Sequence, residues 1–144
     1  MMYPDVEKVV LLEECWMLIN EMMAGSEYTG QFVEKAARRI RKRNGGLIVS
    51  SQNVREFNES KKGRAVLENT EIKMLFGQKP TNIQMTQELF NLSDGERSFL
   101  LTANQGDCLL KMKDTSTKGK VYAFPFEDKL ISKAALKAKN TKEA

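Results

Sequence analysis

The chain has 144 residues, 41% of them hydrophobic, which suits one domain with a core of useful size. Its net charge of +4, from 23 Lys and Arg against 19 Asp and Glu, is too mild to indicate a nucleic-acid-binding protein by itself. Two distant cysteines and no histidine argue against a structural metal site, and without a leader pattern or a run of roughly 18 apolar residues we expect a protein of the reducing cytoplasm.

The first apolar run of the chain, Val9–Leu12, predicts a strand. It is cut off by two acids, Glu13 and Glu14, which is how a strand buried on both faces ends. The apolar segment that follows, 16–23, has helical character and closes at a Gly-Ser pair.

The clearest helix is predicted over 28–43, where apolar residues recur at spacings of three and four. An Asn-Gly-Gly sequence at 44–46 ends it, and 47–51 predicts a second buried strand that stops at Gln52. Two strands joined by a helix of this length pair in parallel, so this half of the chain predicts a βαβ unit. The predicted buried face of the helix comprises Phe32, Val33, Ala36, Ala37 and Ile40.

The second half of the chain predicts shorter elements. We expect a polar surface loop over 58–64, a short helix at 65–69, a third strand at 71–76 and a helix at 80–90. Each of these segments is bounded by a polar or turn-forming residue.

A second helix and a hairpin are predicted to follow. Ser93 and Glu96 have capping-box spacing ahead of the apolar stretch 99–101. Segments 107–113 and 120–124, separated by the turn-rich sequence DTSTKG, predict an antiparallel hairpin at the sheet edge.

Together these elements predict one α/β domain over residues 1–128, in which helices flank a parallel sheet and an antiparallel hairpin lies at the C-terminal edge. From 129 to 144 the chain is rich in Lys and Ala, and we expect a basic tail or frayed helix there.

The paired acids after the first strand have the pattern of a Walker B strand. In such a strand the first acid, here Glu13, holds magnesium through water, and the second, here Glu14, orients or deprotonates the attacking water. A solvated strand end is the alternative.

Gln52 ends the next strand of the predicted sheet. Because the carboxyl ends of adjacent parallel strands share one crevice, an amide there could sense a γ-phosphate or polarise a water molecule. A polar cap on the strand is the alternative.

Five of the six positions from 38 to 43 are basic. Such a run could offer an arginine finger to a neighbouring subunit or contact DNA phosphates, and a solvated helix face is the alternative. No aromatic residues interleave the run, so stacking on single-stranded nucleic acid is not supported.

The phosphate-binding pattern G-x-x-x-x-G-K-[ST] does not occur in the sequence. Gly119 and Lys120 form its one Gly-Lys pair, but Val121 follows them and Asp114 stands where the first Gly should be. We therefore expect that this chain alone cannot bind the phosphates of a nucleoside triphosphate.

Five segments in order resemble the C-terminal half of the ATPases of type IV secretion and conjugation systems. This family is the VirB component-four class, called TraE- or TrsE-like in Gram-positive elements, and the likeness covers 8–126. Members are similar to HerA- and FtsK-type motors, which implies a partial RecA-like P-loop NTPase core here. The segments are VVLLEECWMLI, AARRIRKRNGGLIVSSQNVREF, AVLENTEIKMLFGQ, NLSDGERSFLL and QGDCLLKM.

The resemblance implies roles for particular residues. Glu13 would be the magnesium-side acid, Glu14 the general base and Gln52 the γ-phosphate sensor, while Arg41 or Lys42 would be offered to a neighbour's nucleotide. The complete family domain uses ATP and Mg²⁺ to power substrate export and pilus assembly. We expect neither cofactor nor ATP turnover on this chain alone.

The chain departs from the family pattern in three respects. Glu13 stands where the family usually has Asp, which changes the reach towards a magnesium shell, and Ser51 replaces Thr but keeps the hydroxyl. The P-loop would lie upstream of Met1. We therefore expect a truncated gene product, a cut piece or a degenerate relative.

The resemblance and the absent P-loop also imply partners. We expect self-association or a hexamer of the parent ATPase, contact with other secretion components, and membrane association through that complex. The alternative is a non-catalytic module that docks on a full-length ATPase or on DNA through its basic helix.

Overall fold

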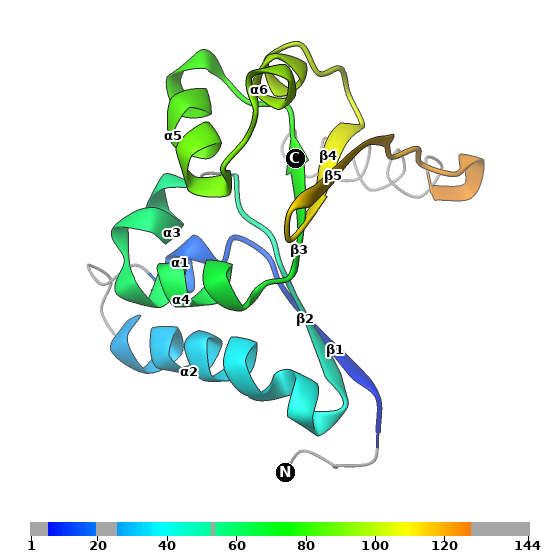
Figure 1. Ribbon diagram of the computed structural model, residues 1–144. Coiled ribbons are helices and arrows are strands. Elements are labelled where there is room, and N and C mark those ends of the chain that lie inside the picture. The colour runs from blue at the N-terminus through cyan, green and yellow to red at the C-terminus, as the bar shows by residue number, and fades with distance from the viewer. Residues whose placement is uncertain (1–5, 20–25, 53, 128–144) are drawn as a thin grey trace, which may run out of the picture.

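The computed structural model describes residues 6–19, 26–52 and 54–127 (Figure 1). The predicted basic tail, 129–144, and the end of the predicted helical segment, 20–23, lie outside the described residues. The strands are β1 Lys8–Leu12, β2 Gly45–Val49, β3 Ile72–Phe76, β4 Asp107–Met112 and β5 Thr115–Lys120. The helices are α1 Trp16–Ile19, α2 Ser26–Arg39, the 3₁₀ turn η1 Ile40–Arg43, α3 Arg55–Glu59, α4 Lys61–Asn69, α5 Pro80–Phe90 and α6 Asp94–Leu101.

The strands form two sheets. β1 and β2 pair in parallel, with Lys8 opposite Gly45 and Leu12 opposite Val49, which confirms the predicted βαβ unit. β3, β4 and β5 form an antiparallel sheet of three strands. The fold is therefore a mixed α/β structure with a parallel sheet and a C-terminal antiparallel hairpin, as predicted.

Helices α1 to α4 cover one side of the parallel pair (Figure 1). Their core contains Cys15, Val33, Phe57 and Val66, all buried. Close approach of α3 and α4 requires Gly63, because a Cβ there would lie 2.4 Å from the carbonyl oxygen of Phe57.

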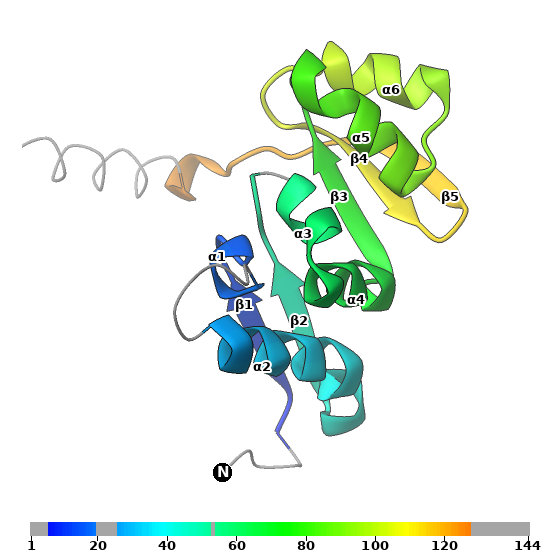
Figure 2. The same ribbon diagram turned by 90° about the vertical axis from the view of Figure 1, so that its left-hand side faces the viewer.

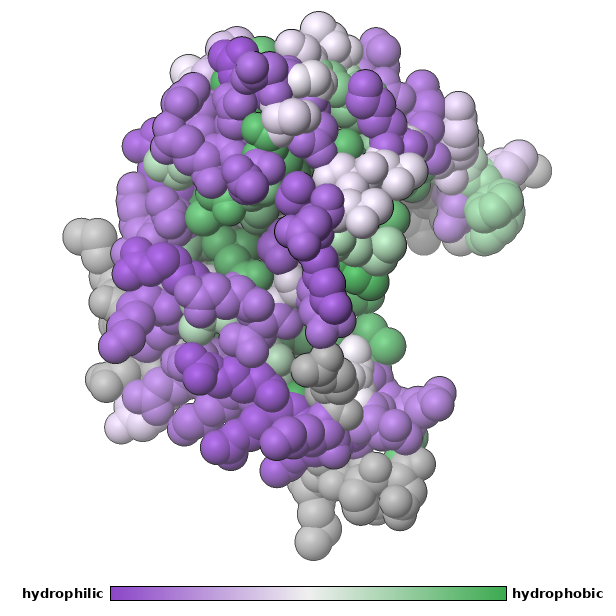
Figure 3. All heavy atoms as spheres, in the orientation of Figure 1, coloured by the Kyte–Doolittle hydropathy of each residue, from purple (hydrophilic) through white to green (hydrophobic). Residues whose placement is uncertain are grey.

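Among the described residues, the other side of the parallel pair is bare. Val9, Leu11 and Ile48 are 68%, 63% and 54% exposed, so the prediction that β1 and β2 are buried on both faces is wrong for this chain by itself. Their burial alternates with a period of two, as in strands with one covered face. Figure 3 shows hydrophilic residues over most of the helical side, with hydrophobic residues at the right edge and also between the helices at the left.

The predicted helix over 28–43 is α2 followed by η1, and one of its predicted core positions is wrong. Val33 and Ile40 are buried, but Phe32 is 54% exposed. An apolar residue next to the buried stripe of a helix fits the helical spacing almost as well as a residue within the stripe. Spacing alone therefore does not show that Phe32 is exposed and Val33 is buried.

The second core lies between α5, α6 and the antiparallel sheet. It contains Leu75, Ile83, Phe90, Leu100 and Leu109. The predicted capping box is confirmed at the start of α6: the Ser93 amide donates to Glu96 at 2.7 Å, and the Glu96 amide donates to the Ser93 hydroxyl at 3.3 Å.

Two predicted segments are wrong. The expected loop over 58–64 belongs to α3 and α4, because Ser60 caps α4 by accepting a hydrogen bond from the Gly63 amide at 3.3 Å. The expected turn DTSTKG is mostly β5, since the chain reverses at Lys113 and Asp114 and the threonines that follow suit a strand. The second hairpin strand is therefore Thr115–Lys120, and the hairpin extends β3 instead of the parallel pair.

Within the described ranges, no helix combines the length and apolar character needed to cross a membrane.

Candidate functional site

The carboxyl ends of β1 and β2 meet, and the backbone keeps them together beyond the strands. The Ser50 amide donates to the Leu12 carbonyl at 2.9 Å, and the Cys15 amide donates to the Ser50 carbonyl at 3.2 Å. Consequently the residues that follow both strands leave the sheet at one place, as expected for adjacent parallel strands.

Two of the predicted site residues touch at this place. Gln52 donates a hydrogen bond from Nε2 to Oε1 of Glu14 at 2.8 Å. Glu14 is half-buried and Gln52 is exposed, so the pair faces solvent from one side. The structure thus brings the second acid and the amide into direct contact.

The backbone of Glu14 adopts a left-handed conformation, with φ 49°. A non-glycine residue costs energy there and persists where its surroundings hold it; such residues concentrate at functional sites. Here the Glu14 carbonyl accepts the Met17 amide at 3.0 Å, so the residue forms the turn from β1 into α1.

The residues on either side of Glu14 have opposite environments. Glu13 is exposed, whereas Cys15 is completely buried and packs with Val33, Phe57 and Val66. Burial raises the pKa of the Cys15 thiol to about 11, so it stays protonated at neutral pH. Cys15 therefore anchors the turn, and the two carboxylates project towards solvent.

The donor set at this turn suits magnesium held through water. Mg²⁺ prefers oxygen ligands and retains several waters, commonly with one or two protein carboxylates. Glu13 and Glu14 supply two carboxylates at one turn, beside the Gln52 amide. No group of three His, Cys, Asp or Glu that could hold a metal directly occurs among the residues that the structure describes.

The other two predicted site residues, Arg41 and Lys42, belong to η1 at the opposite end of the strands. There the Lys8 amide, at the start of β1, donates to the Asn44 carbonyl at 3.2 Å. Strands of 5 residues separate the two ends by roughly 16 Å. The structure therefore does not bring Arg41 and Lys42 together with Glu13, Glu14 and Gln52 within one chain.

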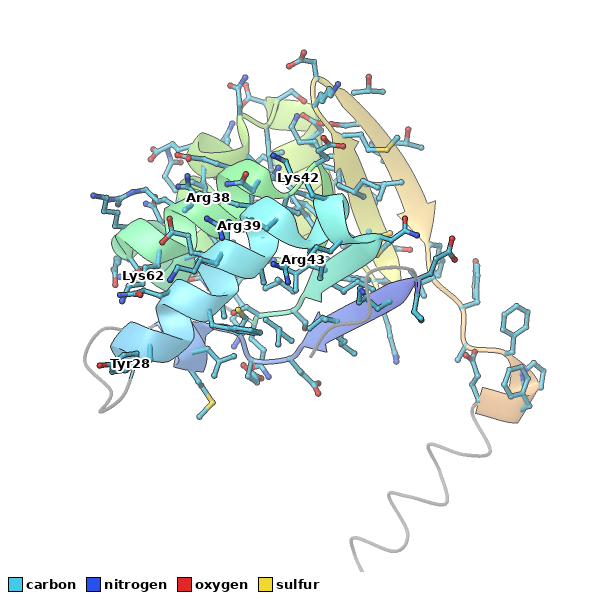
Figure 4. The ribbon with its side chains drawn as sticks, turned by 90° about the horizontal axis from the view of Figure 1, so that it is seen from below. Tyr28, Arg38, Arg39, Lys42, Arg43 and Lys62 are labelled. Carbon is cyan, nitrogen blue, oxygen red and sulfur yellow. The ribbon has the colours of Figure 1, made fainter. Side chains whose placement is uncertain are left out.

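Arg38, Arg39, Lys42 and Arg43 are exposed along the end of α2 and η1 (Figure 4). Arg38 pairs with Glu34 at 3.0 Å one helical turn earlier. The Arg41 side chain lies outside the described part of the structure.

A further lysine joins this basic surface from α4. Lys62 lies beside the first half of α2, where a Cβ on Gly30 would come within 2.7 Å of the Lys62 Cδ (Figure 4). The polar composition of 58–64 predicted a loop, so Lys62 was not expected on a helix; Ser60, which caps α4, was the available signal.

Comparison with known proteins gives one family and several structures. A family model described as the TraG P-loop domain matches residues 2–124. No curated protein sequence matches the chain.

A solved structure of VirB4 of Thermoanaerobacter pseudethanolicus shares 32% sequence identity with this chain, with a TM-score of 0.74 over 85% of it. The chain spans 33% of that VirB4.

Two more distant structures share the fold. The bacterial conjugative coupling protein TrwBdeltaN70 is 9% identical with a TM-score of 0.62, covering 85% of this chain and 33% of its own. The genome packaging NTPase B204 from Sulfolobus turreted icosahedral virus 2, in complex with ATP-gammaS, is 16% identical with a TM-score of 0.58, covering 80% of this chain and 52% of its own.

Proposed function

Because this chain belongs to the TraG P-loop domain family of type IV secretion and conjugation ATPases, we propose that it forms one part of such an ATPase. It contributes the acidic strand end and the sensing amide to a nucleotide site whose phosphate-binding loop comes from elsewhere in the assembly. The observation that carries this proposal is the hydrogen bond between Gln52 and Glu14 at the joined ends of β1 and β2.

Glu14 is the general base in this proposal. Its carboxylate orients the attacking water and accepts a proton from it as the water attacks the γ-phosphate of ATP. The bond from Gln52 supports this role, because it holds the carboxylate of Glu14 in place where the ends of β1 and β2 meet.

Gln52 is the γ-phosphate sensor. Its amide nitrogen is engaged by Glu14, so its amide oxygen remains to accept a hydrogen bond from the same water. A nucleotide that shifts the Gln52 side chain therefore also shifts Glu14, the general base.

Glu13 is the acid on the magnesium side, and it reaches the ion through water. When bound, Mg²⁺ neutralises charge on the phosphates. Glu13 is exposed at the turn where Glu14 is half-buried, so the two acids can serve different partners.

The bare face of the parallel pair supports a shared site. Val9, Leu11 and Ile48 expose apolar side chains in a regular alternation, whereas parallel sheets are ordinarily covered on both faces. We propose that the part of the ATPase bearing the P-loop covers this face, and that this chain alone does not hydrolyse ATP.

Arg41 and Lys42 act on a neighbouring subunit in this proposal. They lie at the end of the strands away from Glu14, so the charge they carry serves a nucleotide held by another copy in a ring. Such a ring would be cytoplasmic and would meet the membrane through other secretion components.

A chimera tests the proposal. In the VirB4 of T. pseudethanolicus, the matching segment is replaced by this chain, and magnesium-dependent ATP hydrolysis is measured. The proposal predicts turnover by the chimera, loss of turnover on Glu14→Gln, and retained ATP binding. A chimera that binds ATP and hydrolyses it equally fast with Glu14→Gln contradicts the proposal.

The second candidate function is a non-catalytic module that docks through its basic surface. The observation that favours it is the addition of Lys62 from α4 to the cations of α2 and η1 (Figure 4). A surface assembled from two helices presents more charge than a solvated helix face requires. The salt dependence of DNA binding separates this candidate from the first.

A further inference from the structure

Two lysines lie directly opposite each other in the antiparallel sheet. Lys73 of β3 pairs in register with Lys111 of β4. Like charges at directly opposed positions destabilise a sheet, since the side chains of such a pair lie on the same face. Both residues are half-buried, so water screens their repulsion less than it would on an open surface.

This lysine pair interrupts an apolar surface. One pair further along the same face, Leu75 lies opposite Leu109, and both are buried in the core beneath α5 and α6. The face that packs against these helices therefore changes from apolar to cationic within two residues. The lysine pair adds no apolar packing at this position, so packing does not explain it.

The cationic end of the face opens into a groove of about 610 Å³. Lys73, Lys111 and Ser116 belong to its sheet side, and Asn91 and Ser93 belong to the connection between α5 and α6. Figure 2 shows that this connection and the turn between β4 and β5 lie at the same end of the structure, on the right. The volume is in the range of sites that hold small molecules.

Charge in the groove is not balanced internally. Its lining has three lysines, Lys73, Lys111 and Lys113, against two carboxylates, Glu96 and Asp114. Glu96 is engaged by the Ser93 amide at 2.7 Å and by the Ser93 hydroxyl at 2.8 Å. A hydrogen bond from Ser116 and the charge of Lys111 also lower the pKa of Glu96, so this carboxylate offsets part of the charge of Lys111 while it caps α6.

The lysines themselves bond to neutral oxygens. Lys111 donates to the Ser116 hydroxyl at 3.3 Å, and Lys73 donates to the Thr70 carbonyl. In the described part of the chain, neither lysine forms an ion pair with a carboxylate. Burial, and then the charge of Lys111, lower the pKa of Lys73, which is the response of an ammonium group that lacks a nearby anion.

We propose that this groove is a binding site for a phosphate group, held between Lys73 and Lys111 with Lys113 at the rim. The site is separate from the nucleotide site, because it is built from β3–β5 and the α5–α6 connection and not from the ends of β1 and β2. A phosphate dianion offers several acceptor oxygens at once, which matches two ammonium groups beside the Asn91 amide. The phosphate belongs either to a small anion or to a nucleic acid backbone.

Calorimetric titration of the chain with pyrophosphate at low ionic strength tests the site. Three variants are compared with the unaltered chain: Lys73→Gln, Lys111→Gln, and Lys79→Gln as the control, in which an exposed lysine outside the groove is changed. Loss of one charge-assisted contact should weaken binding by about tenfold or more in the first two variants and not in the third. Equal affinity in all four proteins, or no binding to any, overturns the proposal.

A parallel titration with a short single-stranded DNA identifies the source of the phosphate. DNA binding that weakens with Lys73→Gln and Lys111→Gln assigns the site to a nucleic acid backbone. Binding of pyrophosphate alone assigns it to a small anion.

Two measurements guard against a merely structural effect. Because burial and the charge of Lys111 disfavour the charged form of Lys73, Lys73→Gln should unfold at the same or a higher temperature than the unaltered chain. The pKa of Lys73, followed by NMR, should rise when pyrophosphate is added, since an anion favours the charged ammonium. An unchanged pKa at saturating pyrophosphate also overturns the proposal.

Discussion

Gln52 donates a hydrogen bond to Glu14 across 38 residues of chain, with 2.8 Å between Nε2 and Oε1. The bond joins the ends of two parallel strands through side chains, just beyond the point where backbone hydrogen bonds already join them. Glu14 also has a left-handed backbone conformation. The turn therefore positions its backbone, and the bond from Gln52 positions its carboxylate.

Removal of this bond should impair catalysis more than stability. In the VirB4 chimera, Gln52→Leu should lower the rate of ATP hydrolysis by about 100-fold, as for loss of a group that positions a proton transfer. The pair is exposed on one side, so the free energy of unfolding should fall by about 1 kcal/mol or less. Gln78→Leu is the control, because Gln78 also follows a strand and bonds to the Phe76 carbonyl at 3.1 Å, outside the proposed site. Equal rates in both variants would argue against the role of Gln52.

The contact between α3 and α4 should not tolerate a larger residue at 63. A Cβ on Gly63 would lie 2.4 Å from the carbonyl oxygen of Phe57, and backbone has to move to relieve that contact. Gly63→Ala should therefore destabilise the chain by about 1 to 3 kcal/mol in urea unfolding. Gly95→Ala is the matched control, because no atom lies within 4 Å of that Cβ and Ala favours a helix; it should stabilise by up to about 1 kcal/mol. The same sign for both changes would refute the packing argument.

Glu96 should make stability depend on acid pH. Hydrogen bonds from Ser116 first, and then from the Ser93 amide and hydroxyl, lower the pKa of Glu96 to about 2. The folded pKa is below the unfolded value of about 4.3, so the stabilisation is complete above that value and is lost as the pH falls towards 2. Glu96→Ala should cost about 1 kcal/mol at pH 7 and progressively less in acid, measured by urea unfolding at several pH values. Glu68→Ala, at an exposed position of α4, should show no such trend.

The basic surface should bind DNA with a steep dependence on salt if it contacts phosphates. Affinity for a short duplex should then fall strongly between about 50 and 200 mM salt. The slope of the logarithm of the binding constant against the logarithm of the salt concentration should become shallower by about 2 in the double variant Arg39→Gln, Arg43→Gln. Fluorescence anisotropy at several salt concentrations measures both quantities. Lys118→Gln, on β5, serves as the control. Undetectable duplex binding at low salt would remove the DNA version of the second candidate function.

The bare face of β1 and β2 should drive self-association of the isolated chain. Val9, Leu11 and Ile48 form an uncovered apolar surface that gains free energy when buried, by about 25 cal/mol per Å². Light scattering should show species larger than a monomer at high concentration, and Leu11→Asn should reduce them. Tyr28→Asn, which alters an exposed aromatic residue of α2, on the side of the parallel pair that the helices cover, is the control. A monomer at all concentrations would contradict the expectation.

Much of the first half of the fold follows from local sequence. The runs that end at Glu14 and Gln52, and the helix between them, were enough to predict parallel strands, and parallel pairing alone predicts that these two residues converge. The capping box at Ser93 was equally local.

Features that depend on distant pairing could not be predicted in the same way. The opposition of Lys73 and Lys111 follows from the register of β3 with β4, which pattern analysis did not assign. Polar composition also predicted a turn where β5 lies, because alternating threonines are as compatible with a strand as with a turn. The left-handed turn at Glu14 leaves no signal in composition, since the residue is not glycine.

The most direct measurement is a structure of the VirB4 chimera with a non-hydrolysable ATP analogue and Mg²⁺. The γ-phosphate should face the ends of β1 and β2, with a water molecule between it and the carboxylate of Glu14 and with Gln52 beside that water. A nucleotide bound elsewhere, with Glu14 and Gln52 still bonded to each other and open to solvent, would rule out Glu14 as the general base.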